Sequence, residues 1–476
     1  MLFNSLQFPI FLFVVLGVYY CLRLRAQNVW LLVASYVFYG AWDWRFLFLL
    51  AVSTVIDFFV GKAMGATEDE HRRKLLLGIS LTANLGILGF FKYFNFFIDS
   101  AAALLQSAGF QPHLPVLNIV LPVGISFYTF QTLSYTFDVY RRRLEPTKDL
   151  LNFALFVAYF PQLVAGPIER AKHLLPLLES PRVVTWKQIA VGVELIIIGY
   201  FKKVGVADTL GPLVDARFSA PGLASGADLL LSVYLFSFQI YCDFSGYTDI
   251  ARGVSRLFGV DLMRNFNQPY LSRNITEFWR RWHISLSTWL RDYLYITLGG
   301  NRGGTRKTYR NLMLTMLLGG LWHGAAWNFV IWGGIHGIYL SIHKWFMGLK
   351  GHREPVPPRT FLGNLVAIFV TFHLVAITWI FFRAHGFEQA WAVISGIVHW
   401  QPATDWIAPI SWLSPRLWAL VGTLVVIDVV QSHRGDHAVM VGRSAVARTA
   451  VYTVLVLMTL VLGNLNENIP FIYFQF

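Results

Sequence analysis

The chain has 476 residues, of which 55% are hydrophobic and 16% aromatic, and only 14% are charged. Soluble proteins carry about a quarter charged residues, so the composition excludes an ordinary soluble enzyme and indicates a polytopic membrane protein. The formal net charge is +13, but arginine and lysine gather in short connections, including 23–25, 72–74, 141–143 and 302–310. This placement follows the positive-inside rule and gives little support to nucleic-acid binding.

Apolar runs long enough to cross a bilayer follow one another along the chain. A helical span needs about 20 apolar residues, and we predict spans near 5–22, 46–63, 75–98, 188–206, 227–250, 311–330, 361–382, 415–431 and 449–465. Shorter or interrupted runs lie near 28–42, 116–137, 151–166, 331–346 and 387–400. We therefore expect one all-α membrane domain over 1–476, with about 9–12 crossings and some re-entrant segments.

The first apolar run lacks a basic segment and a small-residue cleavage site, so we interpret it as a retained helix and not as a signal peptide. Alternating the spans against the basic loops places the N-terminus outside and 301–310 in the cytosol. The runs VLPVGISFY (120–128) and FPQLVAGPIER (160–170) contain proline and glycine. Irregular backbone at membrane depth is tolerated inside protein or beside a cavity, so these runs predict an internal cavity.

Residues 278–293, FWRRWHISLSTWLRDY, have the pattern of an amphipathic helix. Such a helix lies along a membrane interface, and we predict that this one lies on the cytosolic side. Its arginines would contact lipid phosphates, or they would form the basic floor of a cavity and attract a polyanionic acyl donor. Nine Lys/Arg residues and two acids between Arg264 and Arg310 favour a basic floor. The candidates for contacts with donor phosphates are Arg280, Arg281, Arg302, Arg306 and Lys307.

Two histidines lie in the apolar run LLGGLWHGAAWNFVIWGGIHG (317–337). If a helix begins near Arg310, His323 lies roughly 20 Å along its axis and so well inside the hydrocarbon core. A polar group at this depth usually faces a cavity or a partner. His323 is therefore a structural histidine, a general base that takes a proton from an acceptor hydroxyl, or a station in a proton relay. His336 lies later in the run, among glycines that indicate close approach of a neighbouring helix or of a ligand, and a structural role is favoured for it.

Other polar residues within apolar runs are interpreted as structural. Asp243 and Asp249 lie about 120° apart on a helix, so we expect bonds to neighbouring helices or to Arg252 rather than a carboxylate pair. Asp57 is interpreted in the same way. There are only two cysteines and no H-E-x-x-H spacing, so no metal site is predicted.

Several blocks together resemble the membrane-bound O-acyltransferase (MBOAT) family, and within it the bacterial alginate O-acetyltransferase (AlgI-type) branch. The main blocks are WRRWHISLSTWLRDYLYITLGGNR (279–302) and the run 317–337 quoted above. Further agreement comes from FPQLVAGPIER (160–170), QIYCDFSGYTDIARG (239–253), NFNQPYLSRNITEFW (265–279) and PFIYFQF (470–476).

The resemblance implies a ring of tilted transmembrane helices with re-entrant segments around a central tunnel. It assigns His323 to the family's central catalytic histidine, within a catalytic helical segment over 311–346, and His283 to the second signature position, with a positioning role. Many eukaryotic relatives have asparagine at that second position. Further candidates for the substrate site or tunnel are Trp279, Trp282, Trp322, Asn328 and His336.

The resemblance also implies an acyltransferase in the bacterial inner membrane. It would move an acyl group, most simply acetyl, from a cytosolic thioester to hydroxyls of an exported polysaccharide such as alginate. The donor would be acetyl-CoA or an acyl carrier, with no bound cofactor, and a periplasmic SGNH-type acetyltransferase is expected as partner. Two alternatives stay open: a D-alanyl transferase of the same family, and a transporter or flippase with His323 and His336 as a proton relay.

Overall fold

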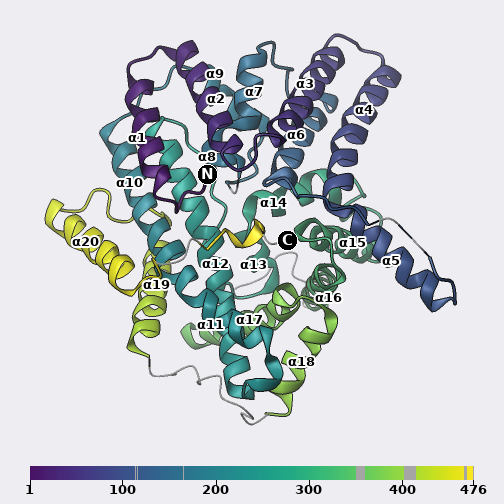
Figure 1. Ribbon diagram of the computed structural model, residues 1–476, viewed down its shortest axis with the longest axis vertical. Helices are drawn as coiled ribbons and strands as arrows, with labels where there is room; N and C mark the ends of the chain where they lie inside the picture. The colour runs from purple at the N-terminus through teal and green to yellow at the C-terminus, as the bar shows by residue number, and fades with distance from the viewer. Residues whose placement is uncertain are drawn as a thin grey trace. The chain divides into compact units, whose positions relative to one another are not determined.

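The computed structural model describes residues 1–112, 114, 116–164, 166–349, 360–400, 414–465 and 469–474. Every regular element in these ranges is helical (Figure 1), which confirms the prediction of an all-α polytopic membrane protein. The described helices that are long and apolar enough to cross a membrane are Phe46–Gly65, Glu70–Ser107, Gly226–Leu257, Phe361–Arg383, Pro415–Arg434 and Ala445–Leu462. The larger number of crossings, the ring and the tunnel stay predictions.

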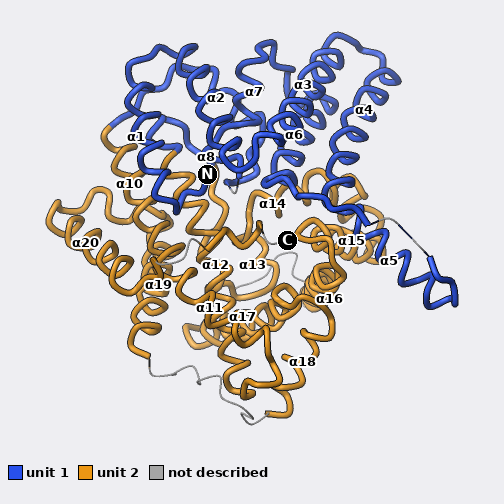
Figure 2. The backbone as a smooth tube through the Cα atoms, viewed as in Figure 1, with its two compact units in different colours: residues 1–185, 255–262 blue, residues 186–254, 263–476 orange. Residues whose placement is uncertain are grey.

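The chain forms two compact units, which are residues 1–185 with 255–262 and residues 186–254 with 263–476 (Figure 2). In unit 1, helices α3 and α4 both pack on α6. The Asp57 carboxylate of α3 accepts hydrogen bonds from Ser80 and Asn84 of α4, at 2.6 and 2.9 Å, so its structural role was predicted correctly. The helical elements of unit 1 are α1 (Gln7–Tyr20), α2 (Leu24–Gly40), α3 (Phe46–Gly65), α4 (Glu70–Leu88), the π-helix η1 (Gly89–Tyr93), α5 (Phe94–Ser107), α6 (Ile125–Tyr140), α7 (Leu150–Ala158), α8 (Phe160–Leu163) and α9 (Ala171–Glu179).

Unit 2 contains all the predicted site residues. Its elements are α10 (Trp186–Tyr200), the π-helix η2 (Phe201–Ala207), α11 (Asp208–Ser219), η3 (Pro221–Leu223), α12 (Gly226–Leu257, of which the residues through Val254 belong to this unit), η4 (Pro269–Leu271), α13 (Ile275–Arg281), α14 (Ile284–Trp289), the π-helix η5 (Leu290–Tyr295), α15 (Thr305–His323), α16 (Trp327–Leu349), α17 (Phe361–Arg383), α18 (Phe387–Val398), α19 (Pro415–Arg434), α20 (Ala445–Leu462) and η6 (Ile472–Phe474).

Helix α12 is the central element of unit 2. In its most apolar stretch 83% of the residues are buried, against 11% for α20, so α12 lies in the protein interior and most of α20 faces outward. A seam of glycines lets α10 approach α12 closely, because a Cβ on Gly253 would lie 2.5 Å from the Gly192 carbonyl oxygen and one on Gly199 would lie 2.7 Å from that of Gly246. Small residues at such spacing bring helix backbones together within membranes.

The stretch 278–293 is not the single amphipathic helix that the sequence predicts. Helix α13 ends at Arg281, and α14 begins after His283, whose φ of +42° is left-handed. The chain breaks here because Asn265 takes up the backbone donors at the start of α14, with its carbonyl oxygen 2.8 Å from the Ile284 N–H and its side-chain oxygen 3.2 Å from the Ser285 N–H. The predicted apolar side chains are nevertheless mostly buried, including Phe278, Trp282, Leu286, Trp289, Leu290 and Tyr293. Its location at a membrane interface stays a prediction.

The segment 311–346, which is predicted to be catalytic, also differs from the predicted helix boundaries. Helix α15 begins at Thr305, before the predicted start near Arg310, and ends at His323. The break predicted near residue 330 lies at 324–326. His323 is therefore the last residue of a helix and not a mid-helix residue.

Candidate active site

Helices α15 and α16 form a close-packed pair that positions His323. A Cβ on Gly320 would lie 2.1 Å from the Phe329 carbonyl oxygen, and one on Gly333 would lie 2.2 Å from that of Met316. Of the two explanations that the sequence allowed for these glycines, the structure therefore supports close helix approach. This approach also brings Trp332 of α16 against the end of α15, with its ring 5.0 Å from that of His323.

The imidazole of His323 lies inside an aromatic enclosure. The side chain is only 3% exposed, and its ring centroid lies 5.1 Å from that of Trp322, 5.4 Å from Phe382 of α17 and 5.6 Å from Tyr473 of η6. The ring of His283 lies 6.3 Å away. The structure thus brings together the two histidines that the sequence selected, from elements separated along the chain.

His283 is fully buried, and its protonation pattern follows from its neighbours. The Asn265 side-chain oxygen lies 3.1 Å from His283 Nδ1. Since the Ser285 backbone N–H can only donate to this same Asn265 atom, the atom is the acceptor and His283 Nδ1 carries the proton. Burial lowers the pKa of His283 to about 3, so the ring is neutral near pH 7 and Nε2 is its acceptor nitrogen.

The tryptophan candidates occupy two positions. Trp322 contacts both histidines, since its ring lies 5.8 Å from that of His283. Trp279 packs on Trp332 at 5.7 Å. Trp282, which is fully buried, packs on Trp379 at 5.0 Å. Trp322 therefore contacts the histidine pair directly, whereas Trp279 and Trp282 pack on two other tryptophans, Trp332 and Trp379.

His336 and Asn328 make structural contacts. The hydroxyl of Thr378 donates to the Val375 carbonyl at 2.7 Å, so it accepts a hydrogen bond from His336 Nε2–H at 3.0 Å. The Asn328 amide donates to the Ala384 carbonyl at 2.7 Å. Both bonds tie α16 to α17 or to the residue that follows it. This fits the structural role favoured for His336, while a place for Asn328 in the substrate site stays a prediction.

The basic candidates divide into paired and exposed residues. Arg281 lies 2.6 Å from Glu277, which also binds Arg273 at 3.1 Å. The other four donor-phosphate candidates are exposed and form no ion pair with any described residue; they are Arg280, Arg302, Arg306 and Lys307. Four of the five predicted cations are therefore available to an anionic ligand.

Sequence reasoning missed four residues that complete the enclosure. Asn265 binds His283, Phe244 of α12 lies 4.7 Å from the His283 ring, and Phe382 and Tyr473 contact His323. Their only signal was that three of them fall within blocks quoted for the family resemblance, at 239–253, 265–279 and 470–476.

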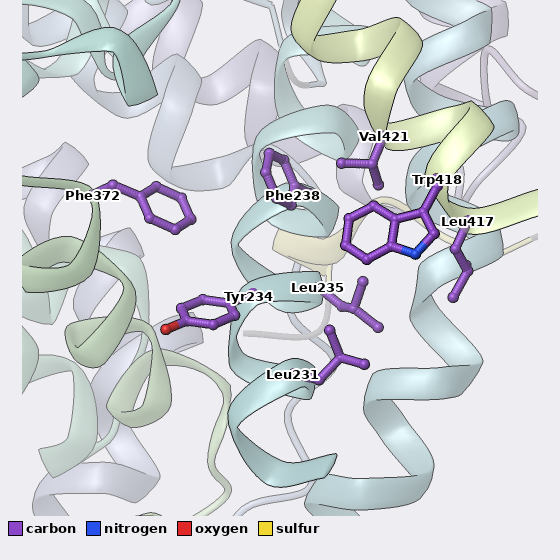
Figure 3. Close-up of a pocket in the computed structure, with 8 residues that line it drawn as sticks. All are labelled: Leu231, Tyr234, Leu235, Phe238, Phe372, Leu417, Trp418 and Val421. Carbon is purple, nitrogen blue, oxygen red and sulfur yellow. The ribbon is translucent and has the colours of Figure 1, made fainter. Parts of the chain in front are cut away.

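An apolar cavity of about 190 Å³ lies elsewhere in unit 2, between α12, α17 and α19 (Figure 3). Its lining residues are Leu231, Tyr234, Leu235, Phe238, Phe372, Leu417, Trp418 and Val421. None of these is a predicted site residue, so this cavity is separate from the histidine pair.

The fold and the enclosed histidine pair are those of a multi-pass membrane protein with a buried polar centre. The chain belongs to the membrane-bound O-acyltransferase family, whose sequence model matches residues 74–387, and it is therefore an O-acyltransferase. This assignment favours the enzyme over the alternative of a transporter or flippase.

Three relatives resemble most of the chain. It is 44% identical over 442 residues to the probable alginate O-acetylase AlgI of Pseudomonas aeruginosa, which covers 91% of this chain and 81% of the relative. It is 46% identical over 401 residues to the protein of the same name from Azotobacter vinelandii, covering 83% and 78%. It is 37% identical over 433 residues to the peptidoglycan O-acetyltransferase of Helicobacter pylori, covering 84% and 80%.

Proposed function

We propose that this protein transfers acetyl groups from a cytosolic thioester to hydroxyls of an exported polysaccharide, with alginate as the first candidate. The observation that carries the proposal is the His323 imidazole, which is 3% exposed and enclosed by aromatic rings beside His283. Relatives named alginate O-acetylases, at 44% and 46% identity, support this acceptor.

In the proposed reaction His323 is the general base. The acceptor oxygen attacks the thioester carbonyl carbon while His323 takes the hydroxyl proton. The C–S bond then breaks, an ester C–O bond has formed, and the proton passes from His323 to the departing thiolate. General base catalysis of this kind contributes about 10²–10⁴-fold to the rate, and the aromatic enclosure would exclude the water that hydrolyses thioesters.

His283 has a positioning role in this proposal. Its Nδ1–H is committed to Asn265, which fixes the ring orientation and leaves Nε2 as a hydrogen-bond acceptor. Burial lowers the pKa of this ring to about 3, so it stays neutral near pH 7 and suits a hydrogen-bonding role. Following the family resemblance, the proton transfer is assigned to His323 and the orientation of donor or acceptor to His283.

The donor would approach from the basic surface formed by Arg280, Arg302, Arg306 and Lys307. These exposed cations suit the phosphates of acetyl-CoA, whose pantetheine arm would reach inward to the histidines through the predicted tunnel. We place this surface on the cytosolic side of a bacterial inner membrane. On the other side a periplasmic SGNH-type acetyltransferase would receive the acetyl group and complete its transfer to the polymer.

A reconstitution experiment tests the proposal. Purified protein in vesicles, with the candidate SGNH-type partner supplied on the outer side, is given acetyl-CoA labelled in the acetyl group and alginate oligosaccharide as acceptor, and free CoA and labelled ester are measured. We expect both products from the parent protein, and a loss of about 100-fold or more in His323→Ala.

His336→Gln is the matched control, because Gln keeps an N–H donor for Thr378 and should retain activity within about tenfold. Near-parental turnover in His323→Ala would falsify the assignment of the base. Turnover only with an acyl carrier protein charged with D-alanine would instead identify a D-alanyl transferase. Deleting candidate SGNH-type partners without any change in polymer acetylation in cells would exclude the relayed transfer.

A further inference from the structure

Two consecutive lysines of the π-helix η2 are buried in ion pairs with α12. Lys202 is 1% exposed and Lys203 is fully buried. Lys202 Nζ lies 2.8 Å from Asp249, whereas Lys203 Nζ lies 2.6 Å from Asp243 and 2.7 Å from Asp208. The prediction that Asp243 and Asp249 bond to neighbouring helices is thus confirmed, and Asp249 also bonds to Arg252. The Lys202–Asp249 and Lys203–Asp243 ion pairs differ in the other groups to which they bond.

The Lys203–Asp243 pair holds the backbone of the segment 469–474. Lys203 Nζ donates a hydrogen bond to the Ile469 carbonyl at 3.1 Å. The other oxygen of Asp243 accepts the backbone N–H of Ile472 at 2.7 Å. Each member of the ion pair therefore bonds directly to this segment, three residues apart.

The same segment carries a side chain of the candidate active site. The Tyr473 ring lies 5.6 Å from that of His323 and 6.5 Å from that of His283. Phe244, the residue after Asp243 on α12, packs on Tyr473 at 4.6 Å and on His283 at 4.7 Å. One turn of α12 thus supports both the segment and the second histidine.

We infer that Lys203 and Asp243 are positioning residues, which fix the segment 469–474 and thereby hold Tyr473 against His323. A buried charge is costly unless it is paired, and here the pair satisfies two backbone groups of a segment that has only one turn of helix. The pair acts on the candidate active site through this segment, to which both of its members bond. The expected effect on turnover rests on the proposed function, while the positioning itself does not.

The neighbouring pair provides a matched control. Lys202 and Asp249 are buried on the same two elements, but Asp249 is bonded to Arg252 at 3.3 Å and lies 3.5 Å from His437. After Lys202→Met the Asp249 carboxylate still has a cationic partner in Arg252. This change therefore removes a comparable buried ion pair without removing a bond to the segment 469–474.

Thiol labelling of the full chain in membranes tests the inference. The background is Cys21→Ser, which removes an exposed thiol, and Ile472→Cys, which adds a probe at a side chain that is 5% exposed. Cys242, which is fully buried, reports global unfolding in the same sample. N-ethylmaleimide labelling of each thiol is followed by peptide mass spectrometry.

We expect Lys203→Met to raise the labelling rate of the introduced thiol about tenfold or more, because breaking a buried pair leaves an unpaired charge. Lys202→Met should change it by less than about twofold, Lys203→Arg should restore protection, and Cys242 should stay protected throughout. In acetyl transfer, Lys203→Met should lower kcat with little change in KM for acetyl-CoA.

Exposure of Cys242 in Lys203→Met would mean that this variant unfolds as a whole. In that case Asp243→Asn, which keeps the side-chain volume, is used instead, and we again expect faster labelling of the thiol at residue 472. Unchanged labelling of the introduced thiol in the Lys203 and Asp243 variants would overturn the inference, as would equal exposure in Lys202→Met. The labelling is independent of chemistry: an active His323→Ala variant would refute the proposed function and leave the positioning result standing.

Discussion

Gly320 of α15 and Gly333 of α16 meet backbone to backbone: a Cβ added to either would lie 3.2 Å from the Cα of the other. The Cβ added to Gly320 would lie closer still to the Phe329 carbonyl oxygen, at 2.1 Å, and the one added to Gly333 would lie 2.2 Å from the Met316 carbonyl oxygen. This approach sets the angle at which the end of α15, with His323, faces Trp332.

Alanine at Gly320 should therefore destabilise the protein. A Cβ there has no room, because the nearest atoms belong to backbone, and overpacking of this kind costs about 1–3 kcal/mol. Gly334→Ala is the control, since its Cβ would lie 3.4 Å from a flexible Leu317 methyl. Thermal unfolding in detergent should give a clearly lower Tm for Gly320→Ala than for Gly334→Ala; equal values would contradict the close-packing argument.

Substitutions at His283 should distinguish the roles of its two ring nitrogens. Asparagine can supply an N–H near the position of Nδ1, and so keep a bond to Asn265, but it has no counterpart of Nε2 in the same place. We expect His283→Ala to lower kcat more than His283→Asn, by about tenfold, which corresponds to one hydrogen bond. Steady-state kinetics with acetyl-CoA measure both, and identical losses would show that the Asn265 bond is irrelevant to turnover.

His283 should also make the folded state sensitive to acid. Burial lowers its pKa to about 3 in the folded protein, against an ordinary value of 6.5. The unfolded chain binds the proton more readily, so stability is full above pH 6.5 and falls as the pH drops towards 3, by at most about 1.4 kcal/mol per pH unit. The free energy of unfolding is measured for the parent and for His283→Asn across pH 4–7, and the difference between them gives the contribution of His283. A constant difference across this range would refute it.

The exposed cations should matter for donor binding and not for chemistry. Replacing Arg302, Arg306 and Lys307 together by alanine removes three exposed charges, each worth up to about 1 kcal/mol to a bound phosphate. We expect KM for acetyl-CoA to rise about tenfold or more with kcat little changed, and the difference to shrink at high salt. Acetyl-pantetheine, which lacks the phosphates, should show no difference between the variant and the parent. If it does, the surface does not bind donor phosphates.

The sequence was sufficient to select both histidines, because a Trp-His pair in an apolar run is unusual and its spacing is characteristic of a family. It was sufficient for most long helices too: α3 and α17 lie within a few residues of the predicted spans. Apolar length alone determines such elements.

The break at His283 could not be predicted in this way. Apolar side chains keep helical spacing from Phe278 to Tyr293, so the pattern continues through a residue whose backbone is left-handed. The break depends on Asn265, which lies outside the amphipathic stretch. In the same way, nothing local to Tyr473 or Phe382 indicates that they meet His323, because that contact depends on how α12, α15 and α17 pack.

The paired charges between η2 and α12 have a consequence for how the protein is made. Without α12, the Lys202 ammonium of η2 would lack its carboxylate partner, and without η2, Asp243 of α12 would lack the lysine that pairs with it. Hydrocarbon penalises each of these charges severely. We therefore expect η2 to become stably buried only after α12 has been synthesised and has packed against it, so that the buried charges are paired when they leave water.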